Sequence, residues 1–254
     1  MTPGQVAAAA VAGALAVTAI VGRTRKKLTT ERLAPALLVA VVGLYVFVAY
    51  TVTIAADHGA TPLDDRVLDL VDKLKSSFGV DLAKIVTTFG TLPVTAAFAI
   101  AGAVVLARRR RPVELAVLVV SVIAIYVGVH ITKAATGRPR PPHPLAGSTL
   151  SSFPSGHAAY STIYVALALL TTRTRSGSAS RAALVIAFLL LTVAIGVSRA
   201  YLRVHWWSDV VAGWALGAAI FGSVAAVGVV VGYFRNNDGG QPAAAGAGRT
   251  AGKQ

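Results

Sequence analysis

The sequence lacks cysteine and contains few charged residues. The absence of cysteine excludes a disulfide framework, a thiolate zinc site and a cysteine nucleophile. Charged residues make up 13% of the 254 residues, whereas a typical soluble domain carries about 25%. Apolar residues make up 55%, and the mean hydropathy is +0.68. These values exclude a disordered chain and argue against a soluble globular domain.

Long apolar stretches dominate the chain. A helix needs about 20 apolar residues to cross a bilayer, and seven stretches without Asp, Glu, Lys or Arg approach or reach that length. Since seven such stretches leave no polar surface for a soluble core, we predict an all-α, polytopic transmembrane helical bundle. We expect six core spans and one extra, Ala-rich span at the N-terminus. The stretches are 5–22, 33–56, 85–107, 115–132, 158–172, 182–198 and 210–234.

Basic residues fall in alternate connections between these stretches. Four segments hold 15 of the 24 Lys and Arg residues, so the positive-inside rule predicts that all four are cytoplasmic. The net charge of +14 then reflects topology and contact with anionic lipid rather than nucleic-acid binding. We therefore predict a multi-pass plasma-membrane protein with a cytoplasmic C-terminus. The four segments are 23–32, 108–111, 173–181 and 235–254.

The same pattern divides the chain into three parts. We predict an N-terminal span with a basic cytoplasmic loop at 1–32, a membrane-embedded domain at 33–234 and a disordered cytoplasmic tail at 235–254. In the outward loop 57–84, Thr61-Pro62-Leu63-Asp64 has the pattern of a helix start with a capping pair. Apolar residues recur at helical spacing from Leu63 to Phe78, which predicts an extracytoplasmic amphipathic helix. It either packs on the bundle as a capped surface helix or guides a lipid substrate.

Three polar clusters lie at the outward ends of the predicted spans. They are Lys133 to Arg140-Pro141, Pro154 to His157, and Ser198-Arg199 to His205 and Asp209. Ionisable groups at such positions are costly and are usually functional when they converge. Taken singly, each has a structural explanation: an interfacial lysine, loop arginines, a helix N-terminus, or a His–Asp pair on one helical face. Arg138, within the first cluster, reads as an ordinary loop charge.

At these residues the sequence resembles the type 2 phosphatidic acid phosphatase superfamily of integral-membrane lipid phosphatases. The signature K-x6-R-P, P-S-G-H and S-R-x5-H-x3-D is matched without a mismatch by residues 133–141, 154–157 and 198–209. The span layout extends the resemblance over about 33–234. A three-part signature of this length is far more specific than a single short motif.

The resemblance implies roles for individual residues. His205 would be the nucleophile that takes the phosphoryl group, Asp209 would orient it, and His157 would be the general acid. The phosphate oxygens would be held by Lys133, Arg140, Ser155, Gly156 and Arg199. No metal and no cofactor are implied. The partners would be the bilayer and a membrane lipid phosphate.

The residue types suit this chemistry. Phosphoryl transfer requires positioning and neutralisation of the phosphate oxygens, and a lysine and two arginines can supply both. A histidine that titrates near 6.5 is available as a neutral nucleophile, and a carboxylate one turn away can hold its far nitrogen. We therefore predict hydrolysis of a lipid phosphate or diphosphate on the outer face. Polyprenyl diphosphate is favoured by family analogy; phosphatidic acid and phosphatidylglycerol phosphate are the alternatives.

Three other functions remain open from the sequence. A lipid phosphotransferase would use the same phosphohistidine but pass the group to an acceptor other than water. A non-enzymatic lipid transporter would use the charges to line a path for headgroups. A metal site could instead be built from His157, His205 and Asp209. The sequence predicts no oligomeric state.

Overall fold

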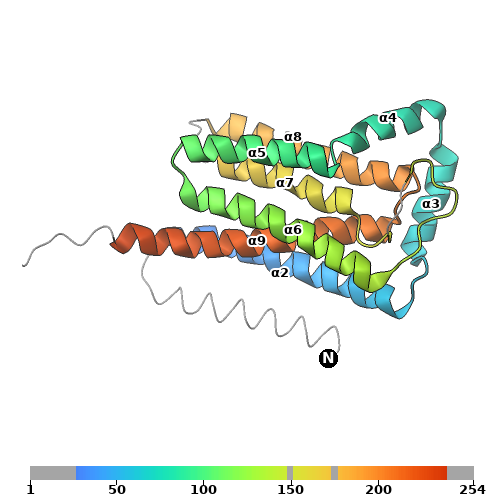
Figure 1. Ribbon diagram of the computed structural model, residues 1–254, viewed down its shortest axis with the longest axis horizontal. Coiled ribbons are helices and arrows are strands. Elements are labelled where there is room, and N and C mark those ends of the chain that lie inside the picture. Colours follow the sequence, from blue (N-terminus) through green and yellow to red (C-terminus); the bar gives the residue numbers. More distant parts are fainter. Residues whose placement is uncertain (1–26, 148–150, 173–176, 239–254) are drawn as a thin grey trace, which may run out of the picture.

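The computed structural model describes residues 27–147, 151–172 and 177–238, and these form eight helices and no strand. Helices α3 and α4 lie at one end of the bundle, and the other described helices run along a common axis (Figure 1). The all-helical prediction is confirmed. The predicted span 5–22 lies outside the described residues. The helices are α2 (Lys27–Ala56), α3 (Pro62–Leu74), α4 (Ser77–Thr88), α5 (Leu92–Arg108), α6 (Pro112–Thr136), α7 (Gly156–Thr171), α8 (Ser178–Tyr201) and α9 (Trp207–Asp238).

Among the described residues, four helices are long and apolar enough to cross a membrane: α2 from Leu33, α6, α8, and α9 as far as Arg235. Helices α4 and α5 would form a fifth span if the pair is counted as one. Helix α7 has 16 residues, which is short for a span. The prediction of several apolar membrane helices is confirmed by length and composition, and the number of six core spans stays a prediction.

Two predicted helices are interrupted. The stretch 85–107 is not one helix, because α4 ends at Thr88 and α5 begins at Leu92 with a bend of 43° between them. Pro93 in the first turn of α5 cannot donate a backbone hydrogen bond, so it begins a helix more readily than it continues one. The predicted amphipathic helix likewise ends at Leu74, and Ser76 caps α4 by accepting from the N–H of Gly79 at 3.1 Å. Helix α9 continues four residues beyond the predicted end at 234.

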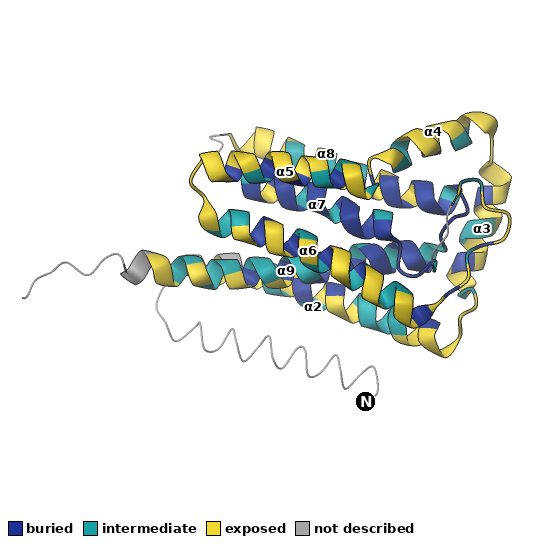
Figure 2. Cartoon of the chain, in the orientation of Figure 1, coloured by how far each residue is buried: buried dark blue, intermediate teal, exposed yellow. Residues whose placement is uncertain are grey.

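Helix α7 forms the centre of the bundle, as the colouring by burial shows (Figure 2). The main apolar core lies between α7 and its neighbours α5, α6 and α9. The other helices expose large apolar side chains on their outer faces, which fits a lipid environment. Such residues include Leu38, Tyr45, Ile85, Ile100, Ile131, Ile186, Leu190 and Val227.

Glycines allow close backbone packing between α2 and α9. A Cβ atom at Gly43 would lie 2.7 Å from the backbone nitrogen of Ala219, and one at Gly222 would lie 2.6 Å from that of Ala40. No larger residue fits either position without separating the helices. Close contact at small residues is typical of packed membrane helices, where dispersion replaces the hydrophobic effect as the main attraction.

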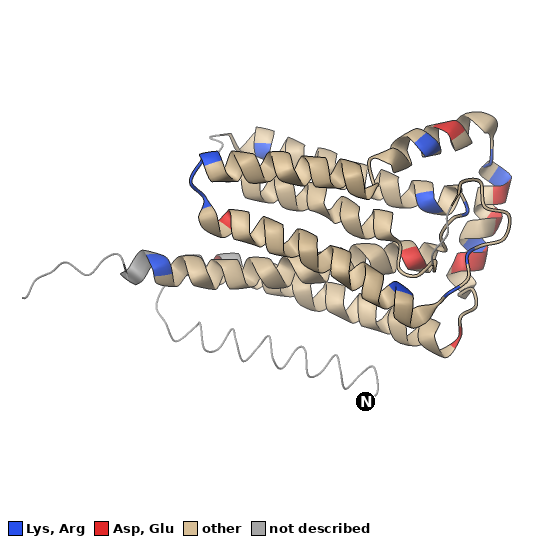
Figure 3. Cartoon of the chain, in the orientation of Figure 1, with Lys and Arg blue, Asp and Glu red and all other residues tan. Residues whose placement is uncertain are grey.

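Helix α3 packs across the ends of α8 and α9. The predicted capping box is confirmed: Thr61 Oγ1 accepts from the N–H of Asp64 at 3.2 Å, and the N–H of Thr61 donates to Asp64 Oδ2 at 2.9 Å. Of the two predicted arrangements, the structure has the capped helix packed on the bundle. The α5–α6 connection, which carries four arginines, lies at the opposite end (Figure 3).

Candidate active site

The three polar clusters meet at the end of the bundle that carries α3. Lys133 comes from the last turn of α6, and Arg140 from the loop that follows α6. Both donate to the carbonyl of Ser151: Lys133 by a short hydrogen bond, Arg140 at 3.4 Å. The positive charges of these two residues also act on His157 and His205. Lys133 and His205 therefore share one site, although they are 72 residues apart along the chain.

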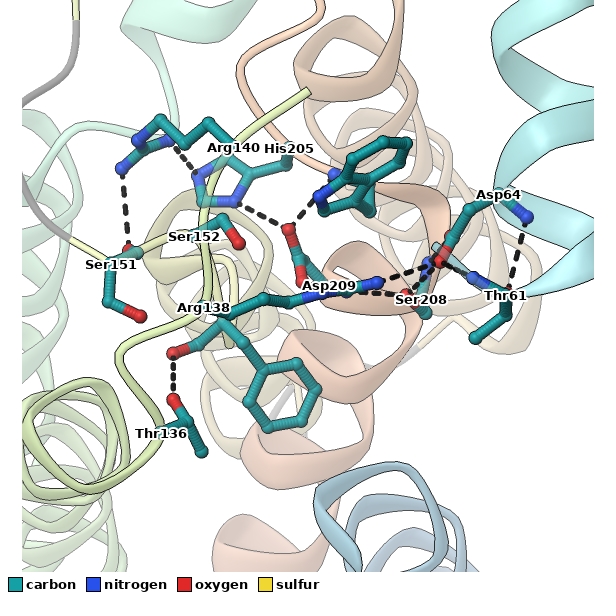
Figure 4. Close-up of polar contacts among 12 residues, drawn as sticks. Thr61, Asp64, Thr136, Arg138, Arg140, Ser151, Ser152, His205, Ser208 and Asp209 are labelled. Carbon is teal, nitrogen blue, oxygen red and sulfur yellow. Dashed lines mark hydrogen bonds and ion pairs between the residues drawn. The ribbon is translucent and has the colours of Figure 1, made fainter. Parts of the chain in front are cut away.

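His205 lies between a carboxylate and a cation (Figure 4). Its Nδ1 is 3.4 Å from Asp209 Oδ2, and its Nε2 is 3.4 Å from an Nη atom of Arg140. The residue is only 4% exposed. Burial, followed by the charges of Arg199, Lys133 and Arg140, lowers the pKa of His205 well below 6.5. The imidazole is therefore neutral at pH 7, as a nucleophilic nitrogen must be.

Asp209 is fixed by both of its oxygens. It lies in the first turn of α9, and its Oδ2 accepts from the N–H of Trp206, the residue before the helix, at 2.9 Å. Its Oδ1 accepts from Arg138 at 2.5 Å. Its side chain has no exposed surface. The carboxylate that faces His205 thus has little freedom to turn away.

The N-terminus of α7 brings the second cluster to the site. Ser155 is the N-cap: its Oγ accepts from the N–H of Ala158 at 3.4 Å, and its own N–H donates to the carbonyl of Asp209 at 2.9 Å. Gly156 and His157 follow in the first turn, where backbone N–H groups have no partner within the helix. The positive end of this helix is suited to an anion. Gly213 of α9 permits the contact, since a Cβ there would lie 2.5 Å from the Ser155 carbonyl oxygen.

Arg199 completes the group of predicted phosphate-binding cations. It is 6% exposed and donates from Nη1 to Thr87 Oγ1 at 2.9 Å. Its carbonyl accepts from the N–H groups of Val204 and His205 at 3.2 and 3.3 Å. These bonds stabilise the turn that carries His205. Thr87 was not indicated by the sequence; it reaches Arg199 because α4 ends beside α8.

Arg138 was interpreted as an ordinary loop charge, and that interpretation is wrong. Its side chain is fully buried and lies 5.4 Å from the centroid of the Trp206 ring. It donates from Nη1 to Asp209 and to Ser208 Oγ (2.8 Å), and from Nη2 to Asp64 Oδ2 (3.0 Å). No signal in the sequence separates Arg138 from Arg140, because residues two apart in an extended segment point to the same face.

A continuous series of polar contacts results (Figure 4). It begins at Asp64 in α3, passes through Arg138 to Asp209, and continues to His205 and Arg140. The described residues contain no group of three or more His, Cys, Asp and Glu side chains placed to hold a metal ion. Among the described residues, His157, His205 and Asp209 are not arranged as such a group, so the alternative of a metal site gains no support from their positions.

Comparison with known proteins shows what the segment that holds this site is similar to. A model of the PAP2 superfamily matches residues 114–232, which include all three clusters. The structure is similar to the crystal structure of the first transmembrane PAP2-type phosphatidylglycerolphosphate phosphatase from Bacillus subtilis, with a TM-score of 0.64 and 22% sequence identity. The similarity covers 77% of this chain and 96% of that one. A search of curated proteins gave no match. The family resemblance drawn from the motifs is confirmed.

Proposed function

We propose that this chain, a PAP2 superfamily protein across residues 114–232, hydrolyses a lipid phosphate or diphosphate through a phosphohistidine at His205. The observation that carries the proposal is the position of the His205 ring. One nitrogen faces Asp209, and the other faces Arg140, within reach of the charges of Lys133 and Arg199. A nucleophile that faces three cations is placed to attack a phosphorus atom whose oxygens those cations hold.

The reaction has two steps. His205 Nε2 attacks phosphorus and the bond to the lipid oxygen breaks, while His157 donates a proton to that oxygen. Burial and the nearby cations disfavour the protonated form of His157, and the negative charge of the bound phosphate would offset them. Asp209 stabilises the positive charge that develops on the imidazole. In the second step water attacks the phosphohistidine, His157 takes the proton from water, and orthophosphate leaves with His205 restored. Lys133, Arg140 and Arg199 neutralise the phosphate oxygens in both transition states.

The position of the site favours a lipid substrate. The site lies at one end of a bundle with apolar outer faces, and the arginines of 108–111 lie at the other end. In a bilayer we expect the site to lie near the headgroups. A lipid could thus place its phosphate in the site and keep its tail in the bilayer. If the arginine-rich end is cytoplasmic, the site acts on the outer leaflet of the plasma membrane.

Among lipid phosphates we predict polyprenyl diphosphate as the preferred substrate, by analogy with family members that serve envelope synthesis. The neighbour from Bacillus subtilis is by its name a phosphatidylglycerolphosphate phosphatase. Phosphatidylglycerol phosphate therefore belongs in any substrate panel, together with phosphatidic acid.

The proposal is tested by measuring orthophosphate release from these three lipids by the purified protein in detergent. We expect release without an added acceptor, unaffected by EDTA, and a histidine-linked phosphate on rapid acid-free quenching. Release that needs a lipid or sugar acceptor would identify a phosphotransferase instead. Lipid movement across vesicles without any phosphate release, retained in His205→Ala, would identify a transporter.

A further inference from the structure

Helix α3 lies outside the segment matched by the family model, yet one of its side chains reaches the centre of the site. The matched residues begin at 114, whereas α3 spans Pro62–Leu74. Asp64, in its first turn, is 1% exposed. A carboxylate is rarely buried to this extent unless its charge is compensated, so its partners indicate what it does.

Asp64 accepts four hydrogen bonds. The N–H of Thr61 donates to it within the capping box at 2.9 Å, and Arg138 Nη2 donates at 3.0 Å. Ser208 donates twice, from its N–H to Oδ1 and from its hydroxyl to Oδ2, both at 2.7 Å. Burial alone would raise the pKa of Asp64, but the bonds from Ser208, Thr61 and Arg138 together lower it. Asp64 is therefore a carboxylate at neutral pH.

The bond from the Ser208 N–H to Asp64 supplies the N-cap acceptor that α9 does not have in its own preceding residue. The first N–H groups of a helix have no partner within it and are usually satisfied by an acceptor side chain at the N-cap. The residue before α9 is Trp206, whose indole has no acceptor oxygen. Asp64 accepts from the N–H of Ser208 in the first turn, so α3 caps the helix that carries Asp209. A negative charge at this helix end is also favourable because of the helix dipole.

The bond to Arg138 places the guanidinium between two carboxylates. Arg138 contacts Asp64 through one Nη atom and Asp209 through the other, and the carbonyl of Gly59 accepts from it at 2.7 Å. A planar guanidinium that bridges two carboxylates in this way defines the orientation of both. Without Asp64, Arg138 would keep only Asp209 as a carboxylate partner. Its guanidinium would then be held less firmly, and so would the Asp209 carboxylate that it orients.

Helix α3 is attached to the site at its other end as well. Asp72 pairs with Arg203, two residues before His205. The hydroxyl of Tyr201 donates to the carbonyl of Leu74 and accepts from the N–H of Ser76, both at 3.1 Å. These contacts hold α3 across the turn between α8 and α9, so that Asp64 meets Ser208 in a fixed position.

We propose that Asp64 is a positioning residue for the reaction: by capping α9 and holding Arg138, it keeps Asp209 directed at His205. This inference rests on the proposed function of the site. The hydrogen bonds of Asp64 go to Thr61, Arg138 and Ser208, which are not among the residues proposed to hold the phosphate. Loss of Asp64 should therefore lower kcat about 10- to 100-fold, the range typical of residues that orient a catalytic ligand, and should change KM by less than about twofold.

The test compares Asp64→Asn with Asp65→Asn. The two residues are adjacent in the first turn of α3, but Asp65 is exposed. Both variants lose one negative charge, so a difference between them reports the buried contacts. At the buried position the amide would offer one acceptor oxygen in place of two. The measurements are kcat and KM for orthophosphate release, the thermal unfolding midpoint in detergent, and the rate at which diethyl pyrocarbonate modifies His205 relative to exposed His58, by mass spectrometry.

We expect Asp64→Asn alone to lose kcat and to raise the relative modification rate of His205 severalfold. If Asp64→Asn matches Asp65→Asn in kcat and in His205 reactivity, the inference is wrong and the phosphatase proposal is unaffected. If the wild type releases no phosphate but His205 reactivity still responds to Asp64→Asn, the proposed function is wrong and the positioning contact stands.

A second variant covers the case in which Asp64→Asn does not fold. Ser208→Ala removes only the hydroxyl that donates to Asp64 and accepts from Arg138. It keeps all charges, and we expect a severalfold fall in kcat with KM nearly unchanged. A wild-type kcat in this variant would overturn the inference.

Discussion

The contact between α9 and the start of α7 can be tested by adding a single methyl group at Gly213. A Cβ at Gly213 would lie 2.5 Å from the carbonyl oxygen of Ser155 and 3.2 Å from the backbone nitrogen of Ala159. An ordinary C···O contact is at least about 3.3 Å. Gly213→Ala therefore requires a displacement of roughly 0.8 Å between the two backbones, since neither contacting atom belongs to a flexible side chain.

The displacement should act on the chemistry because each backbone carries groups that we propose to be catalytic. Ser155 caps the helix that carries His157, and Asp209 lies in the first turn of α9. A misplacement of about 1 Å can cost about 100-fold in rate, so we expect Gly213→Ala to lower kcat between about 10- and 100-fold. Stability should change less, because overpacking costs about 1–3 kcal/mol and replacing Gly by Ala in a helix returns about 1 kcal/mol.

Gly128→Ala is the matched control. Gly128 lies within α6, also against α9, but a Cβ there would meet only side-chain atoms of Ile220 and Leu216 at 3.5 Å or more. We expect wild-type kcat and an unchanged or slightly higher unfolding temperature. Phosphate release and thermal unfolding in detergent measure both variants. If Gly213→Ala keeps wild-type values in both assays, the close approach of α7 and α9 does not exist as described.

Three further predictions concern individual side chains. His205→Ala should abolish turnover, while His58→Ala should keep it, because His58 is exposed; equal activities would remove His205 as the nucleophile. The acid limb of the kcat/KM profile should lie below pH 6.5 because the pKa of His205 is lowered; Arg140→Gln, measured with the same substrate, should move the limb upward, since a nearby positive charge is lost. Thr87→Val removes the acceptor of Arg199 and should raise KM about fivefold, the equivalent of roughly 1 kcal/mol for one hydrogen bond; an unchanged KM would show that Arg199 does not need this support.

The elements that were predicted correctly depend on local sequence. Apolar runs of sufficient length gave the helices, since the bilayer constrains them one by one. The capping box at Thr61 and Asp64 was readable because both partners lie within four residues. The basic residues in alternate connections assign each helix end to one side of the membrane. This assignment was enough to predict that Lys133 and His205 lie on the same side, without any knowledge of contacts.

The features that were missed depend on partners far apart in the chain. Asp64 already had a complete local role as a capping residue, so nothing in the sequence indicated that its second oxygen would bond Ser208, 144 residues later. Arg138 lies in a loop, and its burial follows from contacts with Ser208 of α9 and Asp64 of α3, both far away in the sequence. The break before α5 was missed because Phe89-Gly90-Thr91 interrupts an apolar run without adding charge.

The charges of the buried cluster explain why two carboxylates belong in a site for an anion. Four cations without compensation would repel one another at a cost that burial increases. Asp64 and Asp209 neutralise half of that charge, and the net charge that remains is two positive. A phosphate monoester dianion would bring two negative charges and would therefore balance these four cations and two carboxylates. The cations are Lys133, Arg138, Arg140 and Arg199. Arg138 is bound to both carboxylates, so the other three are the cations that we propose for the phosphate. The carboxylate from α3 thus assigns one arginine to structure and allows the others to act in binding.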